Sequence, residues 1–175
     1  MALASGLLWL GAVVSLAATL TPGIAHAIGR LATASAVVGA AVLAVDNAID
    51  GYGIKAIADA WATADATDQQ ALARTLEHGL LLLGGPFRLW IALWLGLPLL
   101  LVGMAVALDR RWPGWFAAMG AAAGTAALLA GVSGFLGRPL VPDTLLFTAV
   151  AGVQQAWALL LAAQLWRRPN ATAAT

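Results

Sequence analysis

The sequence predicts an all-α integral membrane protein, a helical bundle of about five transmembrane helices with one short interfacial helix. Of its 175 residues, 62% are hydrophobic and only 10% are charged, whereas soluble domains average about 45–50% and about 25%. A span needs about 20 mostly apolar residues, and the chain offers five such stretches with mostly short connections. We therefore expect one bundle over residues 1–169 and a disordered tail over residues 170–175.

The charge and the residue inventory exclude several classes of function. A net charge of +1 provides no basic surface for nucleic acid. The chain has no cysteine, so thiolate catalysis and cysteine metal sites are excluded. His26 and His78 fall near opposite ends of the predicted bundle and cannot share a metal. We expect no metal or other cofactor, and the predicted partners are the lipid bilayer and a hydrophobic small molecule or membrane protein, with a homo-oligomer as an option.

The first predicted span covers residues 7–20. Cleavage as a signal peptide is the alternative, because Ala25-His26-Ala27 has the small-x-small form of a cleavage site. The stretch has no basic n-region, which favours a retained span.

The second predicted span covers residues 24–49, and Gly51 and Gly53 are expected to end it. Between residues 54 and 61 apolar side chains recur at i, i+3, i+4 and i+7. This pattern is typical of a short helix lying in the membrane interface. A loop on the aqueous side with one helical turn is the alternative.

The third predicted span covers residues 89–108. A capping box at residues 67–70 predicts the start of a preceding helix, which residues 84–86 (Gly-Gly-Pro) are expected to interrupt. Within the span, Pro98 leaves the carbonyl of Trp94 without its usual donor, which predicts a kink.

The fourth and fifth predicted spans cover residues 115–135 and run from 143 or 144 to 166. Small residues recur every three or four positions along the fourth: Gly120, Gly124, Ala127, Gly131 and Gly134. This spacing predicts a nearly side-chain-free face and close helix packing.

Charged residues predict an orientation in the cell membrane, which we take to be a bacterial inner membrane. Five spans place residues 21–23, 109–113 and the C-terminus at one end, with Arg110-Arg111 and Arg167-Arg168 directly abutting span ends. By the positive-inside rule this end is cytoplasmic. The N-terminus and residues 50–85 then face outward.

One polar cluster is the candidate functional site. On an ideal helix Ser35, Gly39, Asp46 and Asp50 fall within about 60° of one another, so both carboxylates continue a small-residue face that should contact other helices. Ionisable groups inside a bundle are functional candidates.

The next helix supplies Glu77, His78 and Arg88 at the same end as the two aspartates. These five titratable residues form an ion pair such as Asp46–Arg88 that only joins two spans, a pocket for protons or a ligand, or a contact with lipid headgroups. Trp94 and Gln154 lie deeper, where they can line a pocket or hydrogen-bond between helices. Five other tryptophans near span ends predict an aromatic belt: Trp9, Trp90, Trp112, Trp115 and Trp166.

Three functions fit this pattern. The first is a non-enzymatic accessory or ligand- and partner-binding membrane component. The second is an intramembrane enzyme acting on a lipidic or isoprenoid substrate, with Asp46 or Asp50 as the catalytic general acid. The third is a small proton-coupled transporter, which requires a dimer. A cation paired with Asp46 would favour a structural role for it, and an unpaired Asp46 in an apolar pocket would favour chemistry.

Part of the chain resembles a known family. Residues 99–105 form a leucine-rich span with a Gly-x-Ala step, followed by the basic turn 111–115 (Arg-Trp-Pro-Gly-Trp) and the glycines at 120 and 124. The pattern resembles a widespread group of small bacterial membrane proteins known as a domain of unknown function, over about residues 40–135. Gly114 directly after Pro113 departs from the group, which usually has a bulky residue there. The resemblance implies the fold and brings no activity or site residues.

Overall fold

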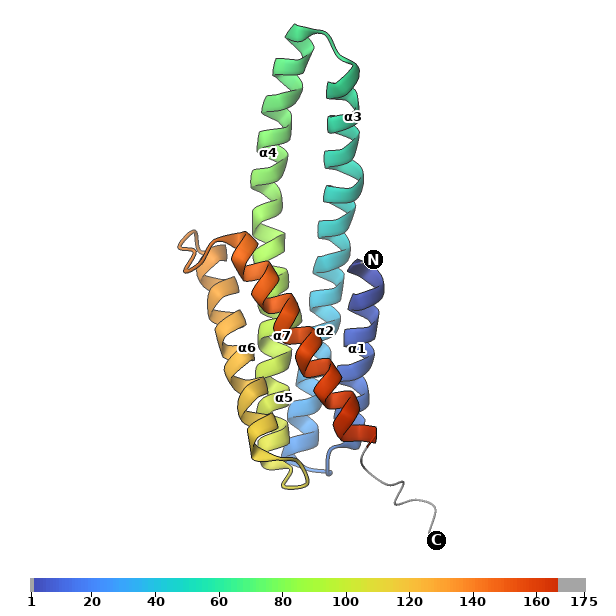
Figure 1. Cartoon of the computed structure of the whole chain (residues 1–175), viewed down its shortest axis with the longest axis vertical. Coiled ribbons are helices and arrows are strands. Elements are labelled where there is room, and N and C mark those ends of the chain that lie inside the picture. Colours follow the sequence, from blue (N-terminus) through green and yellow to red (C-terminus); the bar gives the residue numbers. More distant parts are fainter. Residues whose placement is uncertain (1, 167–175) are drawn as a thin grey trace.

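Every described element of the chain is helical (Figure 1), in a computed structural model that describes residues 2–166 without the side chains of residues 2–5, 143, 147 and 150. The predicted tail at 170–175 lies outside the described residues. The elements in chain order are α1 (Ala2–Thr19), α2 (Ile24–Ala48), the π-helical η1 (Ile49–Ile54), α3 (Lys55–Thr63), α4 (Ala66–Trp90), the π-helical η2 (Ile91–Gly96), α5 (Leu97–Leu108), α6 (Gly114–Phe135) and α7 (Asp143–Trp166). The predicted all-α helical bundle is confirmed.

Four continuous helices among the described residues are long and apolar enough to cross a membrane. They cover residues 24–63, 66–108, 114–135 and 144–166. The apolar part of α1, Gly6–Thr19, is shorter, although the whole helix of 18 residues rises about 27 Å, close to a hydrocarbon core of about 30 Å. These helices suit a multi-pass membrane protein.

The prediction that Gly51 and Gly53 end the second helix is wrong. A glycine ends a helix by adopting a left-handed conformation, and the described glycines with positive φ are Gly23 and Gly137 only. The chain instead passes through the wider π-helical turns of η1 and continues as α3 to Thr63.

The predicted interruption at residues 84–86 is also wrong, because α4 continues through Pro86 to Trp90. Its N-terminus lies earlier than the predicted capping box. The carboxylate of Asp65 accepts hydrogen bonds from the amides of Thr67 (2.9 Å) and Asp68 (3.0 Å), and thus caps the helix.

The segment expected to form the short interfacial helix is α3, which forms with the first half of α4 a hairpin that projects beyond the rest of the bundle (Figure 1). The apolar stripe over residues 54–61 contacts α4 at Ile54, while Ala58 and Trp61 stay exposed. A Cβ built on Gly79 would lie 2.7 Å from Cδ1 of Ile54, and Nε2 of Gln69 donates to the carbonyl of Trp61 (3.3 Å). Helices of 40 and 43 residues rise about 60 and 65 Å, twice the thickness of a hydrocarbon core.

The helices α5 and α6 approach each other closely. The predicted small-residue face of α6 is buried, including Gly120, Gly124 and Gly131. A Cβ on Gly124 would lie 2.1 Å from the amide nitrogen of Leu100, and one on Gly103 would lie 2.4 Å from that of Ala121. The two backbones therefore touch, as the spacing predicted.

The predicted aromatic belt is wrong for three of its five tryptophans. Trp9, Trp90 and Trp112 are buried, whereas Trp115 and Trp166 are exposed. The three join the core because their flat rings fill the gaps between helices; Trp112, for example, stacks on Phe116 with ring centroids 5.7 Å apart.

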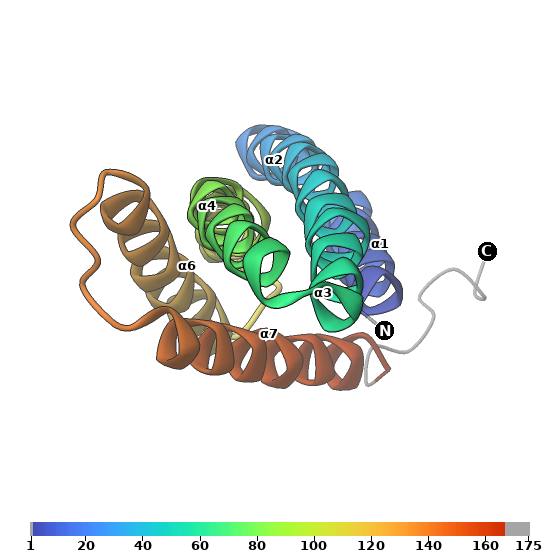
Figure 2. The same ribbon diagram turned by 90° about the horizontal axis from the view of Figure 1, so that it is seen from above.

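The last helix, α7, crosses the other helices obliquely (Figure 2). Its main anchor is Trp157, which is 1% exposed. The indole lies edge-on against Trp9 (5.6 Å between centroids) and stacks on Phe116 (4.9 Å). One side chain thus joins α7 to both α1 and α6.

The turn between α5 and α6 is tied to the loop between α1 and α2. Asp109 is 2% exposed, and its carboxylate accepts hydrogen bonds from the amide of Thr21 (3.0 Å) and from Nε (2.9 Å) and Nη2 (2.7 Å) of Arg111. The same Nη2 also donates to the carbonyl of Thr19. Residues 21–23 and 109–113 therefore share one end of the bundle, as expected for five spans.

Substituting Asp109 by Asn is expected to destabilise the bundle in a pH-dependent way. The hydrogen bonds from Arg111 hold the pKa of the Asp109 carboxyl well below its usual range. Burial acts in the opposite direction and raises this pKa, and the hydrogen bond from the amide of Thr21 lowers it further. Because the folded-state pKa lies below the unfolded-state value of about 3.9, the stabilisation is complete above about pH 5 and is lost as the pH falls further. Since Arg111 is half exposed, we expect a cost of about 2 kcal/mol at pH 7.

Thermal unfolding in an uncharged detergent, followed by circular dichroism from pH 7 to pH 3, measures this effect. The unfolding temperatures of the wild type and Asp109→Asn should differ at pH 7, and the difference should begin to narrow below about pH 5. A constant difference across this range would contradict the assignment of the stabilisation to the ionised carboxylate.

Candidate functional site

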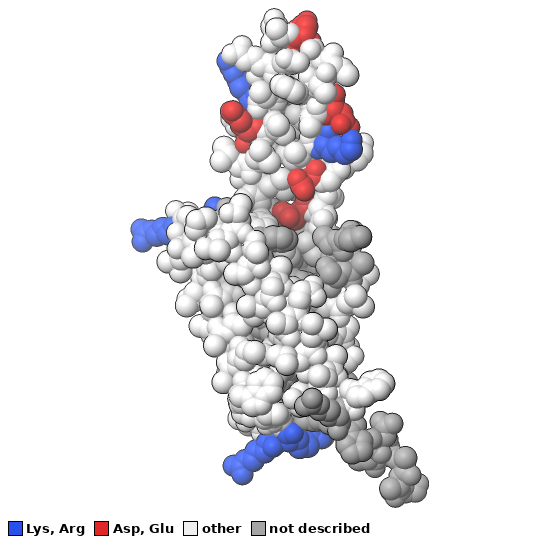
Figure 3. Space-filling view, viewed as in Figure 1, with Lys and Arg blue, Asp and Glu red and all other residues white. Residues whose placement is uncertain are grey.

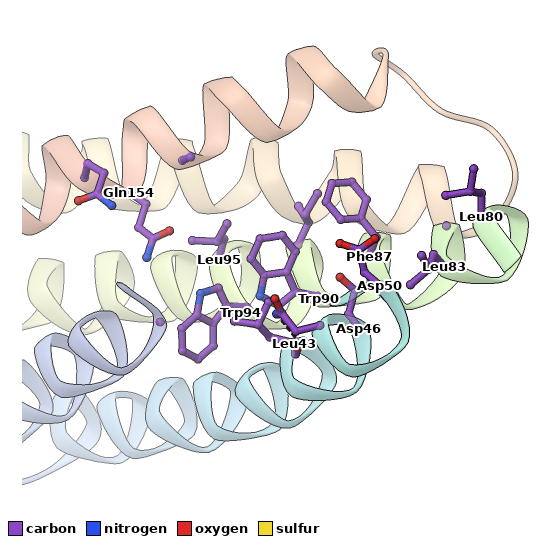
Figure 4. Close-up of a pocket in the computed structure, with 16 residues that line it drawn as sticks. Leu43, Asp46, Asp50, Leu80, Leu83, Phe87, Trp90, Trp94, Leu95 and Gln154 are labelled. Atoms are coloured by element: carbon purple, nitrogen blue, oxygen red, sulfur yellow. Dashed lines mark hydrogen bonds between the residues drawn. The ribbon is translucent and has the colours of Figure 1, made fainter. Parts of the chain in front are cut away.

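A cavity of about 480 Å³ lies between α2, η1, α4, η2 and α7, with Gly6 of α1 at its side (Figure 4). Most of its lining is apolar: Leu43, Leu80, Leu83, Phe87, Trp90, Ile91, Trp94, Leu95 and Ala151. Two of the aromatic rings, Phe87 and Trp90, pack at 5.7 Å with a tilt of 44°. The walls therefore suit an apolar body.

The polar lining comes from three elements. Asp46 and Asn47 on α2 and Asp50 on η1 lie at one end, and Gln154 and Gln155 face the cavity from α7. The side-chain amide of Asn47 donates a hydrogen bond to the carbonyl of Leu43 in its own helix (2.8 Å). One of its two N–H groups is therefore already used within α2. The two carboxylates are the charged groups of the described lining.

The antiparallel register of the two long helices explains this placement. A Cβ on Gly39 would lie 2.6 Å from Cα of Trp94, and one on Gly79 would contact Ile54. The two contacts are the same number of residues apart on both helices, so the two helices keep one register between them. In this register Asp46 lies level with Phe87, and Asp50 lies level with Leu83.

Asp46 is the unusual member of the lining. Its Oδ1 atom is buried and accepts no hydrogen bond, and none of the ion pairs between described residues includes it. Burial of a polar atom costs free energy unless a partner compensates. Asp50, one helical turn further, is exposed at the rim.

The predicted Asp46–Arg88 ion pair is not formed. Nη1 of Arg88 donates to the carbonyl of Gly134 on α6 (2.9 Å), and a Cβ on Gly134 would lie 2.8 Å from Cδ of Arg88. Because α4 is unbroken at residues 84–86, Arg88 follows Phe87 by about 100° around the helix. Phe87 faces the cavity, and Arg88 therefore faces α6.

Glu77 and His78 also lie away from the cavity, contrary to the predicted cluster. Both are exposed on the projecting hairpin, and Nδ1 of His78 lies 2.7 Å from the carbonyl oxygen of Arg74. Glu77 precedes Leu83 by six residues, or about 9 Å along the helix. The unbroken helix carries it beyond the bundle. Of the seven predicted site residues, the cavity brings together Asp46, Asp50, Trp94 and Gln154.

The π-helical segment η2 holds Trp94 in the cavity wall. Pro98 has no N–H, which leaves the carbonyl of Trp94 without a donor in α-helical register and that of Leu93 without one in π-helical register. Side chains of neighbouring helices supply both donors: Nε1 of Trp9 to Trp94 (3.0 Å) and Oγ of Ser35 to Leu93 (2.9 Å). The wall is thereby fixed by α1 and α2.

The sequence analysis missed Phe87, Trp90 and Gln155 as lining residues. Large apolar residues at 80, 83, 87, 90 and 94 follow spacings of three and four without a break. That continuous helical stripe was the available signal, and the expected interruption at residues 84–86 concealed it.

Comparisons with protein-family models, curated proteins and solved structures find no match to this chain. The resemblance to a family of unknown function stays a prediction, and the candidate site stands on its own geometry.

Proposed function

We propose that this protein is a non-enzymatic membrane component that binds a small amphipathic molecule in the cavity between α2, α4 and α7. The observation that carries the proposal is the combination of apolar walls with a buried Asp46 oxygen that accepts no hydrogen bond. Ligand sites are typically apolar concavities of about 300–1,000 Å³ with few polar groups. The cavity volume of about 480 Å³ falls in this range.

The position of α7 supports a ligand that comes from the bilayer. The helix forms one wall of the cavity through Ala151, Gln154 and Gln155, and it crosses the bundle obliquely (Figure 2). Its anchor, Trp157, lies nearer its C-terminal end than the cavity wall does. A small rotation about this anchor would open the wall toward lipid.

Mass spectrometry of molecules that co-purify in mild detergent tests the proposal. We expect the wild type to retain a defined molecule other than bulk phospholipid, and Asp46→Ala to lose most of it. Asp59→Ala is the matched control, because it removes a carboxylate from the same continuous helix, in the hairpin, where Asp59 pairs with Lys55. Equal retention by all three proteins, or only bulk phospholipid in each, would reject the proposal.

An intramembrane enzyme is the second candidate function, and the unpaired Asp46 favours it. In this alternative the carboxyl acts as general acid toward a lipidic or isoprenoid substrate. Conversion of the retained molecule by the wild type, and its accumulation unchanged on Asp46→Asn, would distinguish the enzyme from a binding protein.

A proton-coupled transporter has less support. It needs a path from the cavity to the end of the bundle that holds Asp109. Trp9, Trp157 and Phe116, none more than 2% exposed, fill that part of the core. These rings would have to separate during transport.

We propose a location in the cell membrane, a bacterial inner membrane, with the N-terminus outside and the C-terminus in the cytoplasm. Acidic side chains gather on the hairpin and its base, where Lys55 and Arg74 also lie, whereas the opposite end, with Arg110 and Arg111, shows basic side chains alone among the described charged residues in view (Figure 3). The positive-inside rule favours the arginine end as cytoplasmic.

Because the chain has no cysteine, single cysteines report the orientation. Thr75→Cys in the hairpin should react with an impermeant maleimide on intact cells, and Arg110→Cys only after permeabilisation; both positions are exposed. The reverse pattern would overturn the orientation.

A further inference from the structure

We infer that the molecule bound in the cavity is an organic cation with an apolar body, such as an alkylammonium. The inference rests on the proposed binding function and specifies its ligand class. It follows from the charges of the lining, the aromatic rings beside them and the positions of the neighbouring cationic side chains.

The charges of the lining have one sign. Asp46 and Asp50, four residues apart and on the same side of their helix, contribute the charged groups among the described lining residues. Figure 4 shows both carboxylates at the end of the cavity near Phe87 and Trp90. A neutral ligand can donate a hydrogen bond to the buried oxygen of Asp46 but leaves the two negative charges unpaired, and an anionic ligand is repelled by them, whereas a cation compensates the charge.

Nearby cationic side chains are committed elsewhere. Lys55 pairs with Asp59 on the hairpin, and Arg88 donates to the carbonyl of Gly134. Neither contributes to the cavity lining. The compensating charge is therefore expected to come with the ligand.

Aromatic rings provide the second attraction. Phe87 lies level with Asp46 in the helix pairing, and it packs against Trp90 at 5.7 Å. Ring faces attract organic cations, most strongly where water is excluded. Beyond them, Leu95 and Ala151 continue an apolar wall that an alkyl chain can contact.

Calorimetry in uncharged maltoside detergent tests the ligand class with a matched pair of probes. The first probe is octyltrimethylammonium, and the second is its uncharged isostere with carbon in place of nitrogen. We expect the wild type to bind the cation at least about tenfold more tightly than the isostere. Asp46→Asn should weaken cation binding about tenfold and leave isostere binding within about twofold.

Asp59→Asn is the control and should bind both probes as the wild type does. An unchanged unfolding temperature of Asp46→Asn excludes loss of fold as the cause. Equal binding of both probes to the wild type would overturn the cationic ligand class and leave the proposed binding function standing. Binding of neither probe would overturn the inference and count against the binding function too.

Discussion

Gly124→Ala is expected to destabilise the bundle by about 3 kcal/mol or more, because its Cβ would make the shortest contact of any glycine in the chain. The added Cβ would lie 2.1 Å from the amide nitrogen of Leu100 and 2.7 Å from its Cα. Both atoms belong to the backbone of α5, so no side-chain rotation relieves the overlap. The helices must separate, and the packing that drives helix association in membranes is lost.

Gly11→Ala is the matched control for this prediction. It makes the same substitution in a helix, at a position where the added Cβ meets nothing within 4 Å. Alanine is favoured over glycine in helices by up to about 1 kcal/mol, so the control should be neutral or slightly stabilising. Unfolding in an uncharged detergent measures both variants; similar stability of the two would contradict the close contact of α5 and α6.

Trp157→Ala is expected to cost about 3 kcal/mol and to detach α7 from the bundle. The indole is 1% exposed, and it is the contact that joins α7 to Trp9 and Phe116. Removing it leaves a cavity between three helices. Since α7 also forms one wall of the ligand cavity, retention of the ligand should fall together with stability.

Trp166→Ala removes the same side chain from the same helix where the indole is 91% exposed. It should change neither stability nor retention beyond experimental error. Protease sensitivity of α7 and co-purifying ligand measure the two effects. A loss equal to that of Trp157→Ala would show that α7 is not anchored through its buried indole.

How much of this fold could be predicted depends on what each glycine does. The regular spacing in α6 predicted burial of Gly120 and Gly124, because a repeated small residue has one common meaning, close helix packing. Gly51 and Gly53 are also glycines, but they do not belong to a repeat of small residues at helical spacing. Whether such a glycine ends a helix depends on its φ, which no local pattern determines, and here the chain continues through a π-helical segment.

The candidate site was predictable in part for a similar reason. The helical face of Asp46 and Asp50 follows from their own spacing, and both line the cavity. The expected partners of the two aspartates came from the next helix. The expected break at residues 84–86 placed Arg88 on the wrong face of that helix and Glu77 at the wrong position along its axis. The Trp9 and Ser35 hydrogen bonds to η2 join residues more than 50 positions apart, which no local pattern predicts.

The most direct test of the central claim places a large side chain in the cavity. Ala151→Trp directs an indole into the lining, whereas Ala156→Trp places one on the exposed side of the same helix. Co-purifying molecules are quantified by mass spectrometry for both variants and the wild type. The unfolding temperatures of the three proteins are compared, so that loss of fold is excluded as the cause. Binding in the cavity predicts that Ala151→Trp loses the molecule and Ala156→Trp keeps it; equal retention by both variants would contradict it.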